Sequence, residues 1–341
     1  MDSSKNKHSD HMTEFELIAR LAEVGASSNV ENSESILIGI GDDAAVVSTP
    51  FGQTLLTTDA MVDGVHFRSI DERWHDIGWK CAVSNLSDIA AMGGIPDSAL
   101  VTLGVPPAAS ADTFAELYSG MNEAFELFGG QIVGGDVVSS PIMFVNMALT
   151  GHPSINASGV PICLLRSEAK LDDLVCVTGP LGGSAGGLEV LLSGETNPSG
   201  EILIDRHFRP VPRIEVGNKL VAFGVRCGMD ISDGLVGDLE KIAKLSNVEI
   251  TVNMANIPIV DEMMLLFGAR SITLALSGGE DYELAFTAPE SVVENLTAKK
   301  VEFSVVGRVT GDGSTGAQVI VVDEKGNLHE PIRKGWDHLN G

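Results

Sequence analysis

The sequence predicts an α/β protein of two domains. Strand-like and helix-like segments alternate along the chain, and 44% of the 341 residues are hydrophobic. Glycine followed by an acidic residue also recurs at predicted strand ends in both halves. Alternating strands and helices indicate sheets that are covered by helices. A chain of this length usually forms about two domains, because single cores stop growing near roughly 250–300 residues.

The N-terminal half starts with a polar stretch, Met1–Met12, which lacks an apolar run of signal-peptide type and is expected to be a disordered leader. Apolar residues then recur at helical spacing over Glu14–Val24. The two later helices of this half end at paired glycines, which favour helix termination. The further elements are strands at Ile36–Ile40, Ala44–Val47 and Thr54–Thr58, a helix at Trp74–Met92, a strand at Ala99–Val105, a helix at Ala111–Phe128, and strands at Gln131–Val133 and Ile142–Thr150.

The C-terminal half follows the loop Gly151–Leu171, whose composition marks a domain boundary. We expect a leader at residues 1–12, domains at residues 13–151 and 172–341, and a linker at residues 152–171. The predicted elements are strand Leu174–Thr178, helix Gly183–Leu192, helices Arg213–Phe223 and Gly234–Leu245 around a short segment Gly228–Ile231, strand Val248–Val252, helix Val260–Phe267, strands Ile272–Ala275 and Tyr282–Thr287, helix Pro289–Leu296, and strands Phe303–Val309 and Gln318–Val322.

The charge balance excludes several classes of partner. The chain has 22 Lys plus Arg against 47 Asp plus Glu, a net charge of −25, so nucleic acid and anionic membranes would be repelled. The longest uncharged stretch, Val137–Leu165, contains prolines and is expected to be a strand and a loop, with no membrane span. The four cysteines lie in apolar runs without C-x-x-C spacing, which is typical of buried thiols in a reducing compartment. We therefore expect a cytoplasmic protein.

Several carboxylates occupy unusually apolar sequence. A single acid after a strand is typically a turn residue. However, Asp59 and Asp136 each follow an apolar or uncharged strand, and Asp88 shares residues 77–96 with one other charged residue, Lys80. A partly buried carboxylate must be paired, protonated or bound to a metal. Because almost no Lys or Arg lies beside these acids in the sequence, we predict that they hold metal ions.

The ligand types predict which metal is bound. Carboxylates with the hydroxyls of Thr57, Thr58 and Ser232, without a cluster of His or Cys, favour hard cations, Mg²⁺ first and Mn²⁺ or Ca²⁺ next. Mg²⁺ that is held by a few carboxylates usually shares its coordination shell with substrate phosphates, so several Mg²⁺ ions and a polyphosphate are expected. The chain has no G-x-x-x-x-G-K-[ST] loop and no protein-kinase motifs. The glycine-rich turn Gly179–Gly187 either presents a helix N-terminus to an anion or allows close packing of helix against sheet.

Short motifs follow one another along nearly the whole chain after the leader, from Glu14 to His338. They are Gly39–Ala45, Thr57–Asp59 with Gly64–Phe67, Asn85–Gly93, Gly134–Asp136, Arg206–His207 with Arg209–Pro210 and Pro212–Arg213, Asp230–Gly234, and Ser277–Glu283. In order and spacing they resemble the thiamine-monophosphate kinases, of the superfamily that includes aminoimidazole-ribotide synthetase. The resemblance implies an α/β (α+β) fold of that two-domain type, with an N-terminal mixed sheet covered by helices and a C-terminal α/β domain.

The resemblance also implies a reaction, which is transfer of the γ-phosphoryl group of ATP to thiamine monophosphate. The attacking phosphate oxygen is already anionic, so no general base is required and none is assigned; Mg²⁺ and in-line positioning assist the transfer. The family pattern assigns its ligands as follows: Asp43, Asp59, Asp88, Asp136, Asp230 and Asp233 to Mg²⁺, Thr57 and Thr58 as neutral metal ligands, and Gly135, Arg166 and Ser232 to ATP.

The thiamine part carries a thiazolium cation, which favours an aromatic face. The family pattern assigns His66, Glu280 and Trp336 to this substrate and implies a homodimer formed through the N-terminal sheets. On its residues alone, Trp336 reads as a tail residue packed on the surface, and Arg166 either grips phosphate or is a surface arginine between the domains.

Other functions remain open from the sequence. Aminoimidazole-ribotide synthetase is the alternative within the superfamily, although it fits the segment Gly278–Tyr282 less well. A selenophosphate synthetase would need a Cys near the N-terminus, and the hydrogenase-maturation relative ends in a Cys-bearing tail; neither is present. From another class, the acids could form a non-catalytic divalent-ion-binding module, whose metal affinity would not depend on nucleotide.

Overall fold

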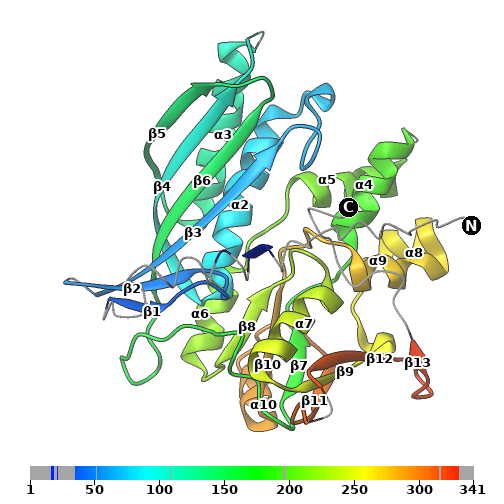
Figure 1. Ribbon diagram of the computed structural model, residues 1–341. Helices are drawn as coiled ribbons and strands as arrows, with labels where there is room; N and C mark the ends of the chain where they lie inside the picture. The colour runs from blue at the N-terminus through cyan, green and yellow to red at the C-terminus, as the bar shows by residue number, and fades with distance from the viewer. Residues whose placement is uncertain are drawn as a thin grey trace, which may run out of the picture.

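The computed structural model describes residues 35–329, except 51, 108, 195, 196 and 315, and also residues 17, 18 and 21. The described chain contains two β-sheets, each with its own helices (Figure 1). Leu17, Ile18 and Leu21 are helical, in agreement with the helix expected at Glu14–Val24, most of which lies outside the described residues. The predicted leader, Met1–Met12, also lies outside them.

The N-terminal sheet has six strands in the order β1-β2-β3-β6-β4-β5. Only the β4–β5 pair is parallel, so the sheet is mixed, as predicted. Along the middle strand, Leu55 is buried and Leu56 is exposed, because successive side chains point to opposite faces. The strands are β1 (Ile36–Ile38), β2 (Ala45–Thr49), β3 (Gly52–Val62), β4 (Gly94–Val105), β5 (Ile132–Ser139) and β6 (Phe144–Pro153).

Two long helices, α2 (Trp74–Ala91) and α3 (Ala111–Phe128), lie on one face of this sheet (Figure 1). They approach each other closely at two glycines. A Cβ atom at Gly78 would overlap the carbonyl oxygen of Leu117, and one at Gly120 would overlap that of His75. Any larger side chain at either position would therefore push the helices apart.

The C-terminal sheet has seven strands in the order β13-β12-β9-β11-β7-β10-β8, and only the β12–β9 pair is parallel. Helices cover it and fill the space toward the N-terminal sheet. The strands are β7 (Leu174–Val177), β8 (Cys227–Asp230), β9 (Glu249–Asn253), β10 (Leu284–Ala288), β11 (Ser304–Gly311), β12 (Gln318–Val322) and β13 (Leu328–His329). The helices are α4 (Gly183–Ser193), α5 (Pro198–Phe208), α6 (Ile214–Ala222), α7 (Leu235–Ser246), α8 (Asp261–Phe267), α9 (Ser271–Ser277) and α10 (Glu290–Ala298), with short 3₁₀ turns η2 (Ser69–Asp71), η3 (Met254–Asn256) and η4 (Gly268–Arg270).

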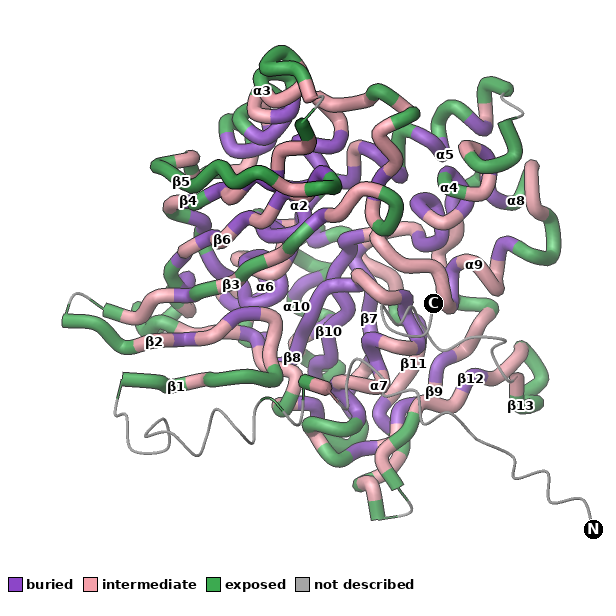
Figure 2. Tube along the Cα trace, turned by 45° about the horizontal axis from the view of Figure 1, so that its top comes forward, coloured by how far each residue is buried: buried purple, intermediate pink, exposed green. Residues whose placement is uncertain are grey.

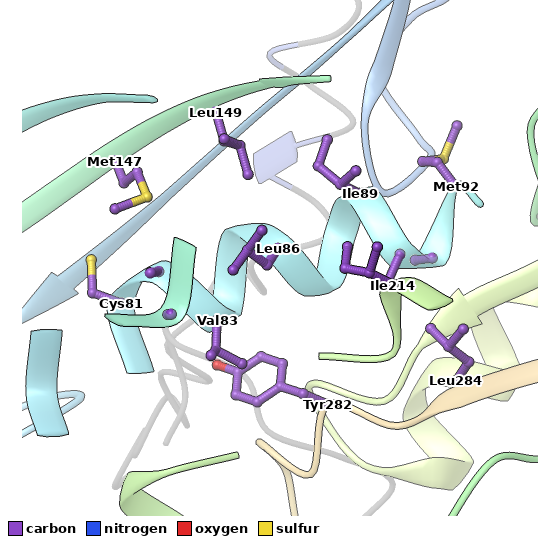
Figure 3. Close-up of a cluster of buried hydrophobic side chains, with 14 of the residues drawn as sticks. Cys81, Val83, Leu86, Ile89, Met92, Met147, Leu149, Ile214, Tyr282 and Leu284 are labelled. Atoms are coloured by element: carbon purple, nitrogen blue, oxygen red, sulfur yellow. The ribbon is translucent and has the colours of Figure 1, made fainter. Parts of the chain in front are cut away.

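The helix α2 is buried between the two sheets. Leu86 points toward Leu149 of β6, whereas Val83 on the other side lies beside Tyr282 of the C-terminal half (Figure 3). Nearly every residue of α2 after Asp76 is buried, which explains why apolar and small residues surround the whole helix (Figure 2). Although α2 is apolar, none of the helices in the described part of the chain is long and apolar enough to cross a membrane.

The structure confirms the predicted fold class and corrects three elements. The run Ile272–Ala275, predicted as a strand, belongs to helix α9, because a short apolar run does not distinguish the two. Helix α5 was not predicted, although Asn197 caps it and Pro198 is its first residue. The strand predicted at Gln131–Val133 continues to Ser139, so the Gly-Gly-Asp motif lies within β5. All four cysteines are free, as predicted.

Candidate active site

Three carboxylates meet where the two halves of the molecule touch. Asp43 precedes β2, Asp88 lies in the last turn of α2, and Asp230 ends β8. One carboxylate oxygen from each lies within 4.8 Å of the others. Sequence segments almost two hundred residues apart therefore build one compact acidic cluster, to which both halves contribute.

The cluster holds negative charge that is poorly solvated. Burial raises the pKa of the Asp88 carboxyl well above its usual value, and the nearby Asp59 raises it further. Burial and Asp43 likewise raise the pKa of Asp230. Hydroxyl donors partly compensate: Thr57 donates to Asp88, and Ser87 Oγ donates to Asp230 Oδ2 at 2.7 Å. A hard divalent cation fits this donor set of carboxylates and hydroxyls.

Arg166 provides one basic partner for the cluster. Its Nη2 donates to Asp43 Oδ1 at 2.6 Å and its Nε to Asp43 Oδ2 at 3.1 Å, which is a bidentate pair. Burial raises the pKa of neighbouring Asp42 to about 6. No sequence spacing indicates this pair, because Arg166 lies 123 residues from Asp43 in the sequence.

Lys241 is the basic partner of two further acids outside the three-carboxylate cluster. Its Nζ lies 2.6 Å from Asp233 Oδ2 and 2.8 Å from Asp238 Oδ1, so Asp233 is also paired. Asp238 is fully buried, and its Oδ2 accepts the backbone N–H groups of Ser232, Asp233 and Gly234 at 3.0, 3.0 and 3.1 Å. The loop that carries two predicted site residues is thus held by one carboxylate from the helix that follows it.

The side chains of Thr57 and Thr58 point to opposite faces of strand β3. Thr57 and Asp59 lie on the face toward α2 and the cluster, whereas Thr58 lies on the opposite, exposed face. Thr58 Oγ1 donates to the carbonyl of Met147 at 2.9 Å. The side chain of Thr58 is therefore not brought to the cluster.

Gly135 and Asp136 lie on β5, whose residues after Ile132 are all exposed (Figure 2). Asp136 Oδ1 accepts the N–H of Val137 at 2.9 Å, and Asp136 is not a member of the three-carboxylate cluster. A Cβ at Gly135 would overlap the carbonyl oxygen of Val101, so the pairing of β5 with β4 requires glycine here.

Two of the predicted substrate residues are near each other. His66 Nδ1 accepts the N–H of Val62 at 3.1 Å, and the imidazole is close enough to Glu280 to affect the pKa of that carboxyl. Glu280 pairs with Lys80 of α2, whose Nζ lies 2.7 Å from Glu280 Oε2. Lys80 is not among the predicted site residues, although it is one of only two charged residues in the apolar stretch 77–96. The third predicted substrate residue, Trp336, lies outside the described residues.

Backbone N–H groups of the glycine-rich turn before α4 bind a side chain of the protein itself, that of Asp281. Asp281 accepts the N–H of Gly182 at 2.7 Å and that of Ser184 at 3.1 Å. Burial raises the pKa of the Asp281 carboxyl to about 7, although these two N–H groups act in the opposite direction. Gly186 and Gly187 pack against Met263 and Leu203. The turn therefore binds an internal carboxylate and packs α4 against helices α8 and α5, which differs from the packing of helix against sheet that the sequence left open.

Comparison with known proteins identifies the class that this fold and site define. The model of the AIR synthase related protein N-terminal domain matches residues 41–153, and that of the C-terminal domain matches residues 170–320. The thiamine-monophosphate kinase of Bacillus subtilis is 35% identical over 339 residues, 96% of this chain and 100% of the relative. That of Aquifex aeolicus is also 35% identical, over 94% of this chain and 100% of the relative.

Solved structures agree with these relatives. The structure of AaThiL in complex with AMPPCP and TMP superposes with a TM-score of 0.82 at 33% identity, covering 96% of this chain and 97% of that chain. The hydrogenase maturation protein HypE in complex with ATP, at 19% identity and a TM-score of 0.67, shares the fold. The chain belongs to the thiamine-monophosphate kinase family, and it is an enzyme of the phosphotransferase class.

Proposed function

We propose that the protein transfers the γ-phosphoryl group of ATP directly to thiamine monophosphate, giving thiamine diphosphate and ADP. The observation that carries the proposal is the cluster of Asp43, Asp88 and Asp230, which both halves of the molecule build within 4.8 Å. Family membership supports the substrates: relatives named thiamine-monophosphate kinase align along their full length, and AaThiL is described in complex with AMPPCP and TMP.

The chemistry of the donor set supports Mg²⁺ as the metal. The donors are mainly carboxylates, and no His or Cys belongs to the cluster of Asp43, Asp88 and Asp230. Burial disfavours the charged form of the Asp88 carboxyl and raises its pKa, so a bound cation would stabilise that charge. Bound Mg²⁺ would neutralise part of the phosphate charge, which otherwise makes ATP and the acceptor phosphate repel each other. The proposed ligands are Asp43, Asp59, Asp88, Asp136, Asp230 and Asp233 with Thr57 and Thr58. The side chains of Asp136 and Thr58 lie outside the cluster of Asp43, Asp88 and Asp230.

The nucleotide contacts are proposed for Gly135, Arg166 and Ser232. Arg166 has the best physical support, because its guanidinium is mostly buried at the edge of the cluster and is already aligned by Asp43. Ser232 lies on the loop that Asp238 fixes. These groups would hold the phosphates while the acceptor is bound by His66, Glu280 and Trp336.

The chain's own residues then have to orient the reactants and exclude water. The acceptor phosphate is anionic, so no residue has to remove a proton from it, and the in-line approach depends on positioning. Arg166 would balance the charge of ATP, and Glu280 would hold the end of the acceptor that carries the cation and the amino group. Alignment of two substrates, each bound by residues from both halves of the molecule, is thus the main contribution of the protein.

We also propose that the enzyme is a cytoplasmic homodimer joined through its N-terminal sheets. Free cysteines, three of them buried, support a reducing compartment. The exposed strand β5 presents unpaired backbone and the apolar side chains Val133 and Val137, at 56% and 66% exposure. Analytical ultracentrifugation of the protein and of a Val133→Lys, Val137→Lys variant tests the dimer; an unchanged oligomeric state in the variant would contradict it.

The proposed reaction is tested by offering the purified enzyme two acceptors with Mg·ATP. We expect thiamine diphosphate from thiamine monophosphate and no product from the amidine precursor of aminoimidazole ribotide. Formation of aminoimidazole ribotide without thiamine diphosphate would overturn the proposal in favour of the synthetase alternative.

Mg²⁺ and ATP are expected to stabilise the protein far more together than separately, since they would share one coordination shell. A ligand at about 100 times its Kd contributes roughly 2.7 kcal/mol to the free energy of unfolding. Differential scanning calorimetry with each ligand alone and with both measures the shift in Tm. An equally large shift with Mg²⁺ alone would favour the non-catalytic ion-binding module.

A further inference from the structure

We propose that Lys80 is a positioning residue for the acceptor substrate, because it holds the Glu280 carboxylate from the opposite half of the molecule. The inference rests on the proposed function, in which Glu280 binds the thiamine part of the acceptor. It adds a residue that touches neither substrate directly but decides where the acceptor-binding carboxylate lies.

The environment of Lys80 is unusual for a lysine. Its side chain is 2% exposed in the middle of α2, although lysine is almost never fully buried without a partner. The Nζ atom lies 2.7 Å from Glu280 Oε2 and 3.5 Å from His207 Nε2. The ammonium group therefore has Glu280 as its charged partner, which lies 200 residues away in the sequence.

Glu280 is held at two points. Its side chain is fixed by Lys80, and its backbone N–H donates to the carbonyl of Ser232, a proposed ATP residue, at 2.8 Å. Its φ of 64° is in the left-handed region, which a non-glycine residue adopts only when its surroundings impose it. Since 28% of the side chain remains exposed, a bound molecule can still reach the carboxylate. Glu280 thus connects the nucleotide loop with the acceptor site.

The charges around the pair are arranged so that Glu280 stays ionised. Burial alone would raise the pKa of the Glu280 carboxyl, but Lys80 beside it lowers the pKa below its usual value. Burial and Lys80 lower the pKa of His207 to about 3, so its imidazole is neutral at physiological pH. His207 Nδ1 pairs with Ser184 Oγ at 3.0 Å, which fixes the ring without adding charge.

An ionised carboxylate with a fixed position suits a ligand that carries a cation or N–H donors. The thiazolium and aminopyrimidine groups of the proposed acceptor provide both. Without Lys80, the carboxylate would be free to leave this position, and the acceptor would be held less firmly, whereas the ATP phosphates are bound by other residues. Lys80 is therefore expected to affect binding of the acceptor more than binding of ATP.

The test compares Lys80→Met, Lys80→Arg and Glu280→Gln with the wild-type enzyme. Isothermal titration of thiamine monophosphate into enzyme saturated with Mg²⁺ and AMP-PCP measures acceptor affinity, and steady-state kinetics give both KM values. We expect Lys80→Met to weaken acceptor affinity by about 10- to 100-fold, as for loss of a charged hydrogen bond. The KM for ATP should change less than about twofold, and Lys80→Arg should recover part of the affinity. Lys219→Met, on the surface of α6, is the matched control.

The double variant Lys80→Met, Glu280→Gln covers the case in which Lys80→Met leaves a buried charge and does not fold. Removing both charges of a buried pair is far better tolerated than removing one. The proposal expects the double variant to bind the acceptor no more weakly than Glu280→Gln alone. It is overturned if Lys80→Met binds the acceptor as the wild type does, if both KM values rise equally, or if the double variant is weaker than Glu280→Gln. A wild-type enzyme that fails to phosphorylate thiamine monophosphate would instead refute the proposed function.

Discussion

Replacing Asp88 by asparagine is expected to reduce phosphoryl transfer by about two to three orders of magnitude while the protein stays folded. Asp88 is the only member of the three-carboxylate cluster that lies on α2, and Asp59 and Asp230 both raise its pKa. Loss of one preorganised group for transition-state charge typically costs about 3–4 kcal/mol of activation free energy. The measurement is kcat with thiamine monophosphate and Mg·ATP at saturating concentrations.

The same substitution should leave the free energy of unfolding in metal-free buffer unchanged or slightly higher. Asparagine is nearly the same size, and it removes charge that burial and three nearby carboxylates disfavour. Asp97→Asn, at an exposed position on β4, is the control and should retain wild-type activity. A wild-type kcat for Asp88→Asn would exclude Asp88 from the site.

Replacing Asp238 by alanine is expected to destabilise the protein and to weaken ATP binding together. The substitution removes the acceptor of three backbone N–H groups and the partner of Lys241 in a fully buried place. Breaking a buried pair of this kind costs about 3–5 kcal/mol. Urea unfolding measures the loss, and the KM for ATP should rise because Ser232 is no longer held.

Asp238→Asn separates the two contributions of this side chain. Its amide oxygen can still accept the three N–H groups, so it should retain more stability than Asp238→Ala although the charge that faces Lys241 is lost. Glu294→Ala, an exposed acid on α10, should change stability by less than about 0.5 kcal/mol. Equal stability of Asp238→Ala and the wild type would show that the loop does not depend on Asp238.

The fold was predictable because its elements carry strong local signals. Helix α3 was predicted with its exact bounds, since Ser110 caps its start and Gly129 follows its end. Helix α9 was misread as a strand, because Ile272 and Thr273 favour strands locally while packing decides the outcome. Strand β5 was predicted too short, because its two glycines resemble a turn in sequence although one of them is required for close pairing with β4.

The acidic residues of the site could be predicted from the sequence, but the basic residues that pair with them could not. Asp88 could be selected because apolar sequence surrounds it, whereas Asp230 was assigned only by the family resemblance. Burial raises the pKa of both carboxyls. The pairs Arg166–Asp43 and Lys80–Glu280 join residues 123 and 200 positions apart, so no sequence spacing reveals them. Asp238 looks like any acid in the first turn of a helix, and only the folded loop shows that it binds three N–H groups.

Thiamine monophosphate labelled with ¹⁸O in its three non-ester phosphate oxygens tests most directly whether the γ-phosphoryl group of ATP is transferred to the acceptor phosphate. If an acceptor phosphate oxygen attacks the γ-phosphorus of ATP, all label is retained and ¹⁸O bridges the two phosphorus atoms of thiamine diphosphate. We predict ³¹P spectra with that isotope shift on both resonances and one ADP for each thiamine diphosphate. Release of AMP, or a product with unlabelled oxygen in the bridge, would contradict the account.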